Sequence, residues 1–281
     1  MIGDSDGSAR EKVIFLGNGM LAEYALEVIS RECEVIFHAH KKEDLTQVVE
    51  LKQQFPEAHA VLASFGVMVL SHVLEVFESE GILNIHPSLL PSFRGASPIE
   101  SAILAGDTDF SVSVMKLAKA MDAGPIYYQT TLSGVDIARV TGSELVSGLV
   151  PEKRAIYQAL ATTGAEWICS HLSDLPEPSS QDDVRATFCG KLDKSMSLLA
   201  PETDTAEQTL RKIVAFQSYP KAKYAFYGVS CIVLEAHILE QGETAPIPLK
   251  CADGRILAID RLQPEGRKAM DAKAFLNGYG K

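Results

Sequence analysis

The first half of this 281-residue chain alternates short apolar, β-branched runs with stretches of helical periodicity. Strands are expected at Lys12–Leu16, Cys33–Phe37, Ala60–Ala63, Gly81–Ile85, Ser111–Leu117 and Ile126–Thr131. Helices are expected at Met20–Ile29, Asp44–Gln54, Val73–Phe77, Pro98–Ala105 and Glu152–Leu172. Because a helix between two strands returns the chain to the same edge of a sheet, this alternation predicts an α/β fold with a mostly parallel sheet and helices on both faces.

The pattern changes after a segment rich in Pro, Ser and acidic residues, Leu175–Asp183, which is typical of a domain boundary. One amphipathic helix is expected next, at Ala206–Phe216. Short strands separated by turn residues follow it, at Lys223–Phe226, Cys231–Ile238, Ile247–Cys251 and Ile256–Leu262. This spacing predicts a second, smaller domain built as a β-barrel or sandwich.

Composition excludes several classes of protein. No apolar run reaches the roughly 18 residues that a membrane helix needs, and the first twelve residues lack the apolar core of a signal peptide. The net charge of -11 argues against indiscriminate binding to DNA or other nucleic acid. The charge is uneven, however: residues 191–281 carry 13 basic and 11 acidic side chains, a net +2, which leaves room for a mildly basic second module.

The five cysteines predict neither a zinc site nor a disulfide framework. They are odd in number, widely spaced and form no C-x-x-C pair. We expect them to be small buried apolar residues in a reducing compartment.

The turn Gly17-Asn-Gly-Met-Leu-Ala22 matches G-x-G-x-x-A between a strand and a helix. In one interpretation this turn binds a dinucleotide, which also requires an acidic residue at the end of the second strand. That strand ends in Phe37-His-Ala-His40 instead. The simpler interpretation is that glycine serves only the tight turn from strand to helix.

Asn84-Ile-His-Pro-Ser-Leu-Leu-Pro91 is the most informative segment for chemistry. Asn84 and His86 alternate at the end of a predicted strand, so their side chains leave the same face. The carboxyl ends of strands are where open α/β sheets bind ligands. Two polar side chains there can donate hydrogen bonds to one oxygen atom, and the two prolines stiffen the loop that follows.

Two further segments, taken alone, indicate only ordinary structure rather than a functional site. Met121-Asp-Ala-Gly124 is typical of a plain turn, and Asp122 gains a chemical role only if it reaches His86. Arg94 precedes a predicted helix whose first turn holds Pro98. A surface position is the simpler expectation for Arg94, and contact with a phosphate or carboxylate is the alternative.

Together these segments resemble the signature of the folate-dependent formyltransferases, in which the Asn84–Pro91 pattern is followed by an Asp in the context Met121-Asp-Ala-Gly-Pro125. Three other stretches are similar to the family members that act on methionyl-tRNA: Arg94–Ile99, Lys191–Lys194, and Leu262–Met270 with Ala274–Asn277. The resemblance runs from Lys12 to Gly278. It implies a Rossmann-like first domain, an OB-like barrel as the second, and a cytoplasmic enzyme without a metal.

The implied reaction moves the formyl group of 10-formyltetrahydrofolate to the α-amine of methionyl initiator tRNA. Carried over by the resemblance, Asn84, His86 and Asp122 would stabilise the oxyanion and shuttle the proton. Folate would contact two stretches: Phe65, Gly66, Val67, Met68 and Ser88, Leu89, Leu90, Pro91. Basic residues expected to contact tRNA are Lys41, Lys42, Arg94, Lys191, Lys194, Lys221, Lys223, Arg267 and Lys268. The enzyme is expected to be a monomer that binds neither DNA nor a membrane.

Departures from the family pattern leave alternatives open. The segment His38–Asp44 is shorter than the Gly- and Arg-containing loop of members that act on tRNA, so Lys41 and Lys42 are expected to stand in for it.

The domains expected are 12–174 and 205–281 with a linker at 175–204, after a disordered extension at 1–11. Other hypotheses are a formyltransferase for an amino-sugar nucleotide, a dinucleotide-dependent oxidoreductase, and a non-catalytic RNA-binding relative.

Overall fold

The computed structural model describes residues 10–78, 81–134, 136–137, 145–146 and 150–280. They form two compact units, each discontinuous in sequence. The first comprises the chain up to Gly95 with Ser111–Thr131 and Tyr157–Phe188; the second comprises Ala96–Phe110, Leu132–Ile156 and Cys189 onward. Of the expected extension, residues 1–9 lie outside the described residues. Arg10 donates hydrogen bonds to the carbonyls of Ser30 and Glu32.

A six-stranded sheet in the order β2-β1-β3-β4-β6-β7 is the centre of the first unit. Its strands are β1 (Lys12–Gly17), β2 (Glu34–Ala39), β3 (His59–Ala63), β4 (Ile82–His86), β6 (Asp109–Lys116) and β7 (Ile126–Ser133). The first four pair in parallel, and β6 runs antiparallel to β4. The mostly parallel sheet predicted from the sequence is therefore confirmed.

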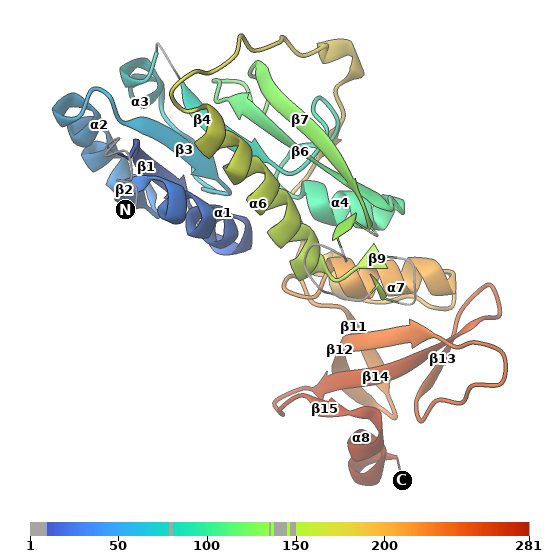
Figure 1. Ribbon diagram of the computed structural model, residues 1–281. Helices are drawn as coiled ribbons and strands as arrows, with labels where there is room; N and C mark the ends of the chain where they lie inside the picture. The colour runs from blue at the N-terminus through green and yellow to red at the C-terminus, as the bar shows by residue number, and fades with distance from the viewer. Residues whose placement is uncertain (1–9, 79–80, 135, 138–144, 147–149, 281) are drawn as a thin grey trace, which may run out of the picture. The chain divides into compact units, whose positions relative to one another are not determined.

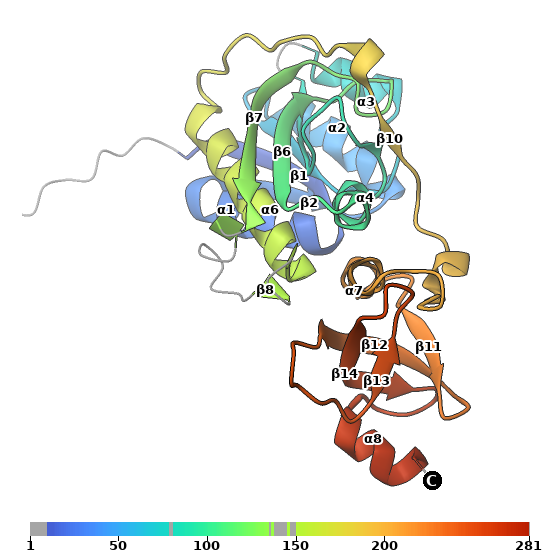
Figure 2. The same cartoon turned by 90° about the vertical axis from the view of Figure 1, so that its right-hand side faces the viewer.

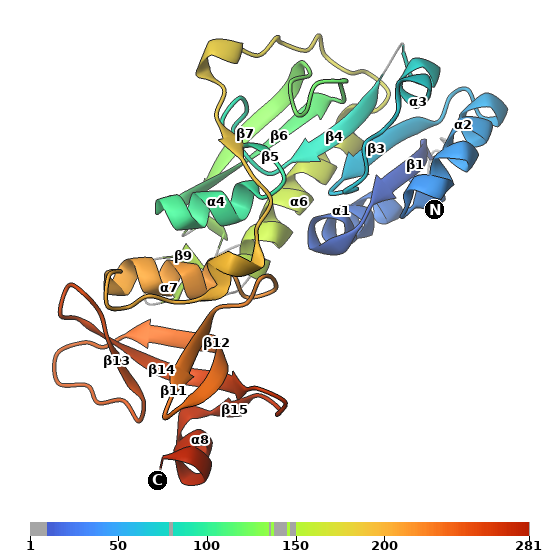
Figure 3. The same ribbon diagram turned by 180° about the vertical axis from the view of Figure 1, so that it is seen from behind.

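Helices cover both faces of this sheet. They are α1 (Gly19–Glu32), α2 (Leu45–Gln54), α3 (Ser71–Val76) and α6 (Lys153–His171), with a 3-10 turn at Lys42–Asp44. Opposite views show α1 and α6 along one face and α2 and α3 on the other (Figures 1 and 3). Gly164 brings α6 close to the sheet, because a Cβ at this position would lie 2.9 Å from Ile85.

The glycines of the turn after β1 have structural explanations. A Cβ on Gly17 would lie 2.5 Å from the carbonyl oxygen of Ala63 and 2.7 Å from the Cβ of Ala22. Gly19 adopts φ +77°, a left-handed conformation that glycine takes without strain. Both glycines are thus required by packing and turn geometry, whether or not a ligand binds.

The second unit contains a curled antiparallel sheet in the order β11-β12-β14-β13, with β15 paired to β14. Its strands are β11 (Lys223–Phe226), β12 (Val229–Ile238), β13 (Pro248–Lys250), β14 (Ile256–Pro264) and β15 (Met270–Asp271). Figure 2 shows α7 (Ala206–Ala215) and α8 (Ala272–Tyr279) at opposite ends of this sheet. The structure thus confirms a small β domain after the first, while β15 and α8 were not expected from the sequence.

Shorter elements complete the fold. The second unit also holds α4 (Pro98–Ala105) and a 3-10 turn at Lys194–Ser197. Two-stranded pairs are formed by β5 (Arg94–Gly95) with β10 (Phe188–Cys189), and by β8 (Leu145–Val146) with β9 (Val150–Pro151). Another 3-10 turn, Asp183–Arg185, precedes β10.

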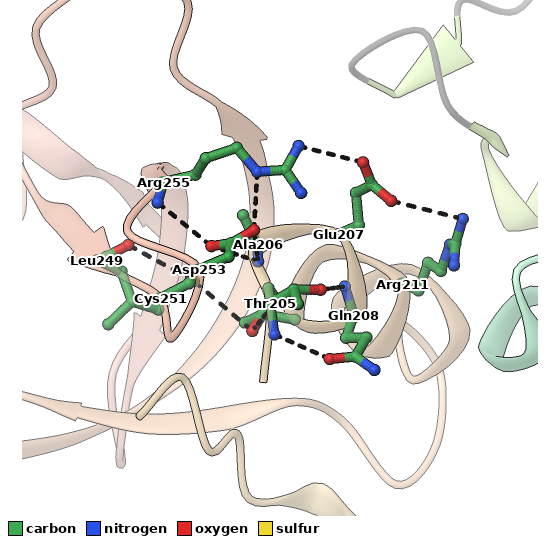
Figure 4. A network of polar contacts seen from close by, with 10 residues as sticks. Thr205, Ala206, Glu207, Gln208, Arg211, Leu249, Cys251, Asp253 and Arg255 are labelled. Atoms are coloured by element: carbon green, nitrogen blue, oxygen red, sulfur yellow. Dashed lines mark hydrogen bonds and ion pairs between the residues drawn. The ribbon is translucent and has the colours of Figure 1, made fainter. Parts of the chain in front are cut away.

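The beginning of α7 is held by side chains at its N-terminus (Figure 4). Thr205 accepts a hydrogen bond from the N–H of Gln208, whose side chain in turn accepts from the N–H of Thr205. This reciprocal capping satisfies two N–H groups that the helix leaves unpaired. Asp253 accepts from the N–H of Ala206 and from the guanidinium of Arg255, so the turn before β14 is tied to the helix start.

The described residues contain no membrane-spanning helix, no metal-binding cluster and no disulfide. Across the described ranges, every helix is too short or too polar to cross a membrane. In the same residues, no group of three or more His, Cys, Asp and Glu side chains is arranged to hold a metal ion. All five cysteines are free, and the Sγ atoms of Cys33 and Cys169 lie 3.8 Å apart.

Candidate active site

The carboxyl end of β4 carries two buried polar side chains, Asn84 and His86, with 4% and 5% of their surfaces exposed. In register, Asn84 lies opposite Leu62 of β3, and His86 lies opposite Ser113 of β6. Two residues apart on one strand, the two side chains leave the same face. Both are thus placed at the end of a central strand, as expected from the sequence.

His86 lies between two acceptors. Its Nε2 donates to the carbonyl oxygen of Phe93 at 3.1 Å, because a carbonyl can only accept. Its Nδ1 lies 3.7 Å from Oδ1 of Asp122, close enough for an electrostatic interaction although longer than a hydrogen bond. Burial lowers the pKa of His86, while the Asp122 carboxylate and the Phe93 carbonyl oppose that shift. The lowered pKa favours the neutral imidazole. The Asp122 carboxylate lies where it would stabilise the protonated form.

Asp122 stands in the turn between β6 and β7, and the structure brings it to His86. Its other carboxylate oxygen, Oδ2, accepts the N–H of Gly95 at 2.8 Å. The backbone of Asp122 has φ +51°, in the left-handed region that side chains disfavour. Gly124 is required in the same turn, because a Cβ there would overlap the carbonyl oxygen of Lys116. The spacing of the sequence could not show whether Asp122 reaches His86. In the structure the two side chains are in contact.

The two stretches expected to bind folate lie in the loops after β3 and β4, with mixed exposure. Phe65, Ser88 and Leu90 are buried, whereas Met68 and Leu89 are 74% and 46% exposed. The buried hydroxyl of Ser113 donates to the carbonyl of Ser88 and accepts the N–H of Leu90, and so fixes the second loop.

Exposed apolar side chains beside a rigid loop suit a flat heterocycle such as a pteridine, and the residues present therefore fit a folate. Leu89 and Met68 would offer apolar contact to such a ring.

Arg94 is buried, so the expected surface position was wrong. Only 4% of it is exposed. Its guanidinium donates to Oε1 of Gln181 through Nε and Nη2, and to Asp183 at 2.7 Å. A buried side chain with these partners is held inside the first unit rather than presented to tRNA, and its role as a tRNA contact loses support.

Gln181 was missed by sequence reasoning. It lies in the Pro- and Ser-rich segment interpreted as a domain linker, and nothing in that composition signals a role beside Asp122. The structure pairs this segment with the site, since Ser179 exchanges backbone hydrogen bonds with Ile126. Thr187 likewise accepts the N–H of Arg94 with its backbone carbonyl.

The remaining basic candidates for tRNA contact are exposed. These are Lys41, Lys42, Lys191, Lys194, Lys221, Lys223, Arg267 and Lys268. Exposure leaves each of them able to reach a phosphate, and their role stays a prediction.

Comparison with known proteins identifies the family. Residues 19–145 match the family described as Formyl transferase, and residues 191–280 match Formyl transferase, C-terminal domain. A methionyl-tRNA formyltransferase of Granulibacter bethesdensis is 35% identical over 230 residues, which cover 78% of this chain and 68% of the relative. The chain belongs to the formyltransferase family. The resemblance seen in the sequence is confirmed, and the family assignment removes the support for an oxidoreductase.

Solved structures share the fold of this formyltransferase at low identity. HypX from Aquifex aeolicus in complex with tetrahydrofolic acid has a TM-score of 0.68 at 17% identity and covers 98% of this chain. The formyltransferase spans about half, 48%, of the HypX chain. A methionyl-tRNA formyltransferase from Clostridium thermocellum (16% identity) and WlaRD, a sugar 3N-formyl transferase (13%), have TM-scores of 0.62 and 0.60. Each covers 93% of this chain, which spans 99% and 100% of those structures.

Proposed function

We propose that this folate-dependent formyltransferase moves the formyl group of 10-formyltetrahydrofolate to the α-amine of methionyl initiator tRNA. The observation that carries the chemistry is the cluster at the end of β4, where the imidazole of His86 lies beside the carboxylate of Asp122. The 35% identity to a methionyl-tRNA formyltransferase supports the acceptor. A soluble substrate and a charged tRNA imply a cytoplasmic enzyme, and we expect it to act as a monomer.

The folate supplies an activated formyl group, and the residues of the chain stabilise charge and move a proton. As the amine attacks, negative charge develops on the formyl oxygen. The Asn84 amide and the Nε2 proton of His86, which the Phe93 carbonyl accepts in this structure, are donors for that oxygen. Preorganised donors lower the barrier because they need no reorganisation when the charge appears.

His86 also takes the proton that the attacking amine releases, at Nδ1, because Nε2 already carries a proton. Burial lowers its pKa, so the imidazole is neutral and able to accept a proton near pH 7. The Asp122 carboxylate then stabilises the imidazolium. The proton returns to the folate nitrogen as the carbon–nitrogen bond to the donor breaks, so the site ends as it began.

The acceptor is the part of the proposal that a direct assay must test. The protein is incubated with 10-formyltetrahydrofolate and initiator tRNA charged with methionine, and formylmethionine is measured after deacylation. Parallel reactions contain UDP- and dTDP-linked amino sugars, because the structure also shares the fold of a sugar 3N-formyl transferase. Formylation of the charged tRNA supports the proposal, whereas formylation of an amino sugar alone overturns the acceptor and keeps the chemistry.

A further inference from the structure

The side chain of Gln181 joins the turn that carries Asp122 to the buried Arg94. Its Nε2 donates to the carbonyl oxygens of Asp122 at 2.8 Å and Gly124 at 2.7 Å. Its Oε1 accepts from Nε and Nη2 of Arg94 at 3.1 and 2.7 Å. A guanidinium only donates and a carbonyl only accepts, so chemistry fixes which end of the amide faces which partner. Both amide protons and both oxygen lone pairs are used.

These interactions close a ring of hydrogen bonds around Asp122. Gly95, the neighbour of Arg94 in sequence, donates its N–H to the Asp122 carboxylate at 2.8 Å. Residues 94–95 thus hold Asp122 twice, once at its carboxylate and once, through Gln181, at its backbone carbonyl. A side chain fixed at both places has little freedom to rotate away from the His86 imidazole, 3.7 Å away.

The turn needs such support because its backbone is unfavourable. Asp122 has φ +51°, a conformation that non-glycine residues rarely keep without surrounding restraint. Arg94 is 4% exposed and Gln181 is half-buried, so water competes weakly for their hydrogen bonds. Without the Gln181 amide, two carbonyls of the strained turn would lose their donors.

We infer that Gln181 is a positioning residue for formyl transfer: by holding the Asp122 turn, it keeps the carboxylate of Asp122 against His86. This inference rests on the proposed function, in which Asp122 stabilises the His86 imidazolium. Gln181 acts through Asp122 and is assigned no contact with a substrate.

Two substitutions separate this role from simple anchoring of the loop. Gln181→Leu removes every hydrogen bond of the amide. Gln181→Glu keeps two acceptor oxygens for Arg94 but removes both donors to the Asp122 turn. We expect both variants to lower kcat by about tenfold to a hundredfold, with the KM for folate and for acceptor unchanged, because misplacement of a catalytic group slows the chemical step. Gln208→Leu, at the start of α7, is the matched control and should retain full kcat.

Coupling to Asp122 is tested by a double-substitution cycle. If Gln181 acts through Asp122, then Gln181→Leu adds little to the reduction in kcat caused by Asp122→Asn. Additive reductions would overturn the inference, and so would a wild-type kcat for Gln181→Glu. A wild-type kcat for Asp122→Asn would instead overturn the role that the proposed function gives Asp122, so the two failures are distinguishable.

The pKa of His86 can be measured without any substrate, so it tests the inference even if methionyl-tRNA is not the acceptor. NMR titration of the imidazole C2 protons, with the His86 signal assigned from His86→Ala, reports the pKa of His86. In Gln181→Leu, which adds no charge, this pKa should fall below the wild-type value, as in Asp122→Asn, because the Asp122 carboxylate is what raises it. An unchanged pKa in a folded Gln181→Leu protein, checked by its thermal melt, would overturn the inference.

Discussion

At the scale of single residues, two opposed effects set the pKa of His86. Its almost complete burial disfavours the charged imidazole, while Asp122 and the carbonyl of Phe93 favour it. Such a balance suits a group that must accept a proton and give it back within one turnover. In the proposed mechanism the stabilisation of the formyl oxygen can be tested separately, because the amide of Asn84 is a donor that does not titrate.

Replacing Asn84 therefore isolates the stabilisation of the oxyanion. We expect Asn84→Ala to lower kcat by about a hundredfold to a thousandfold, the usual cost of removing one preorganised donor, with a smaller effect on the KM for folate. Steady-state formylation assays at saturating acceptor measure both constants. A variant within a few-fold of wild-type kcat would remove Asn84 from the catalytic residues.

The pH dependence of kcat tests the balance at His86. In the proposed mechanism the neutral imidazole of His86 is the base. Because its pKa is lowered, kcat should hold below pH 6.5, the ordinary value for histidine, and fall only on further acidification. Asp122→Asn removes the contribution that raises this pKa, and the acidic limb should move to still lower pH. His237→Gln, which alters an exposed His–Asp pair, is the control and should leave the limb in place. A shift toward higher pH in Asp122→Asn would contradict this account.

At the scale of elements, the sequence predicted those that hydrophobic periodicity marks clearly. All four parallel strands and the helices between them were predicted within a few residues, because their apolar runs are largely buried. The short helix α8 was missed, since its stability comes from Asp271 at its N-terminus and the burial of Phe275 rather than from length. Gln181 was missed for a related reason: composition marks a loop as irregular but cannot say which elements it pairs with.

A buried ion pair joins the first turn of α6, which belongs to the second unit, to two helices of that unit. Lys153 of α6 lies 2.7 Å from Glu100 of α4, with only 4% and 7% of the side chains exposed. The same Lys153 ammonium donates to the carbonyl of Ala215 in the last turn of α7 at 2.8 Å. Removal of one partner takes an opposite charge away from a buried ion, which is far more costly than removal of one partner of a surface pair.

Glu100→Leu should therefore destabilise the protein by about 3–5 kcal/mol, and Glu100→Leu with Lys153→Met should recover much of that stability. Urea denaturation followed by circular dichroism measures both. Glu207→Leu breaks the more exposed ion pairs with Arg255 and Arg211 (Figure 4) and should cost no more than about 1 kcal/mol. Equal destabilisation by the two single variants would mean that burial does not control the stability of these pairs.

At the scale of the whole molecule, sequence and structure contributed different information about the site. The motifs selected Asn84, His86 and Asp122 by resemblance, while their proximity needed the fold, because 36 residues separate His86 from Asp122 along the chain. Arg94 shows the limit of motif reasoning, since the motif marked the position but could not show that its side chain is buried against Gln181. The net charge of a domain, in contrast to the proximity or burial of a side chain, can be counted from the sequence alone.

If the proposed acceptor is correct, an acidic protein must bind a polyanionic tRNA. The net charge is -11 overall, yet residues 191–281 carry +2 and expose most of the basic candidates. If these side chains bind phosphates, the KM for charged tRNA should rise steeply with salt, while the KM for folate changes little, because only the polyanion releases counterions on binding. Arg267→Ala with Lys268→Ala should weaken tRNA binding and reduce the slope of log K against log salt by about one for each phosphate that is no longer neutralised. Arg31→Ala, which removes an exposed charge of α1 paired with Glu27, is the control and should leave the slope unchanged. A slope equal to wild type in the double variant would exclude these two residues from the interface and direct attention to Lys41 and Lys42.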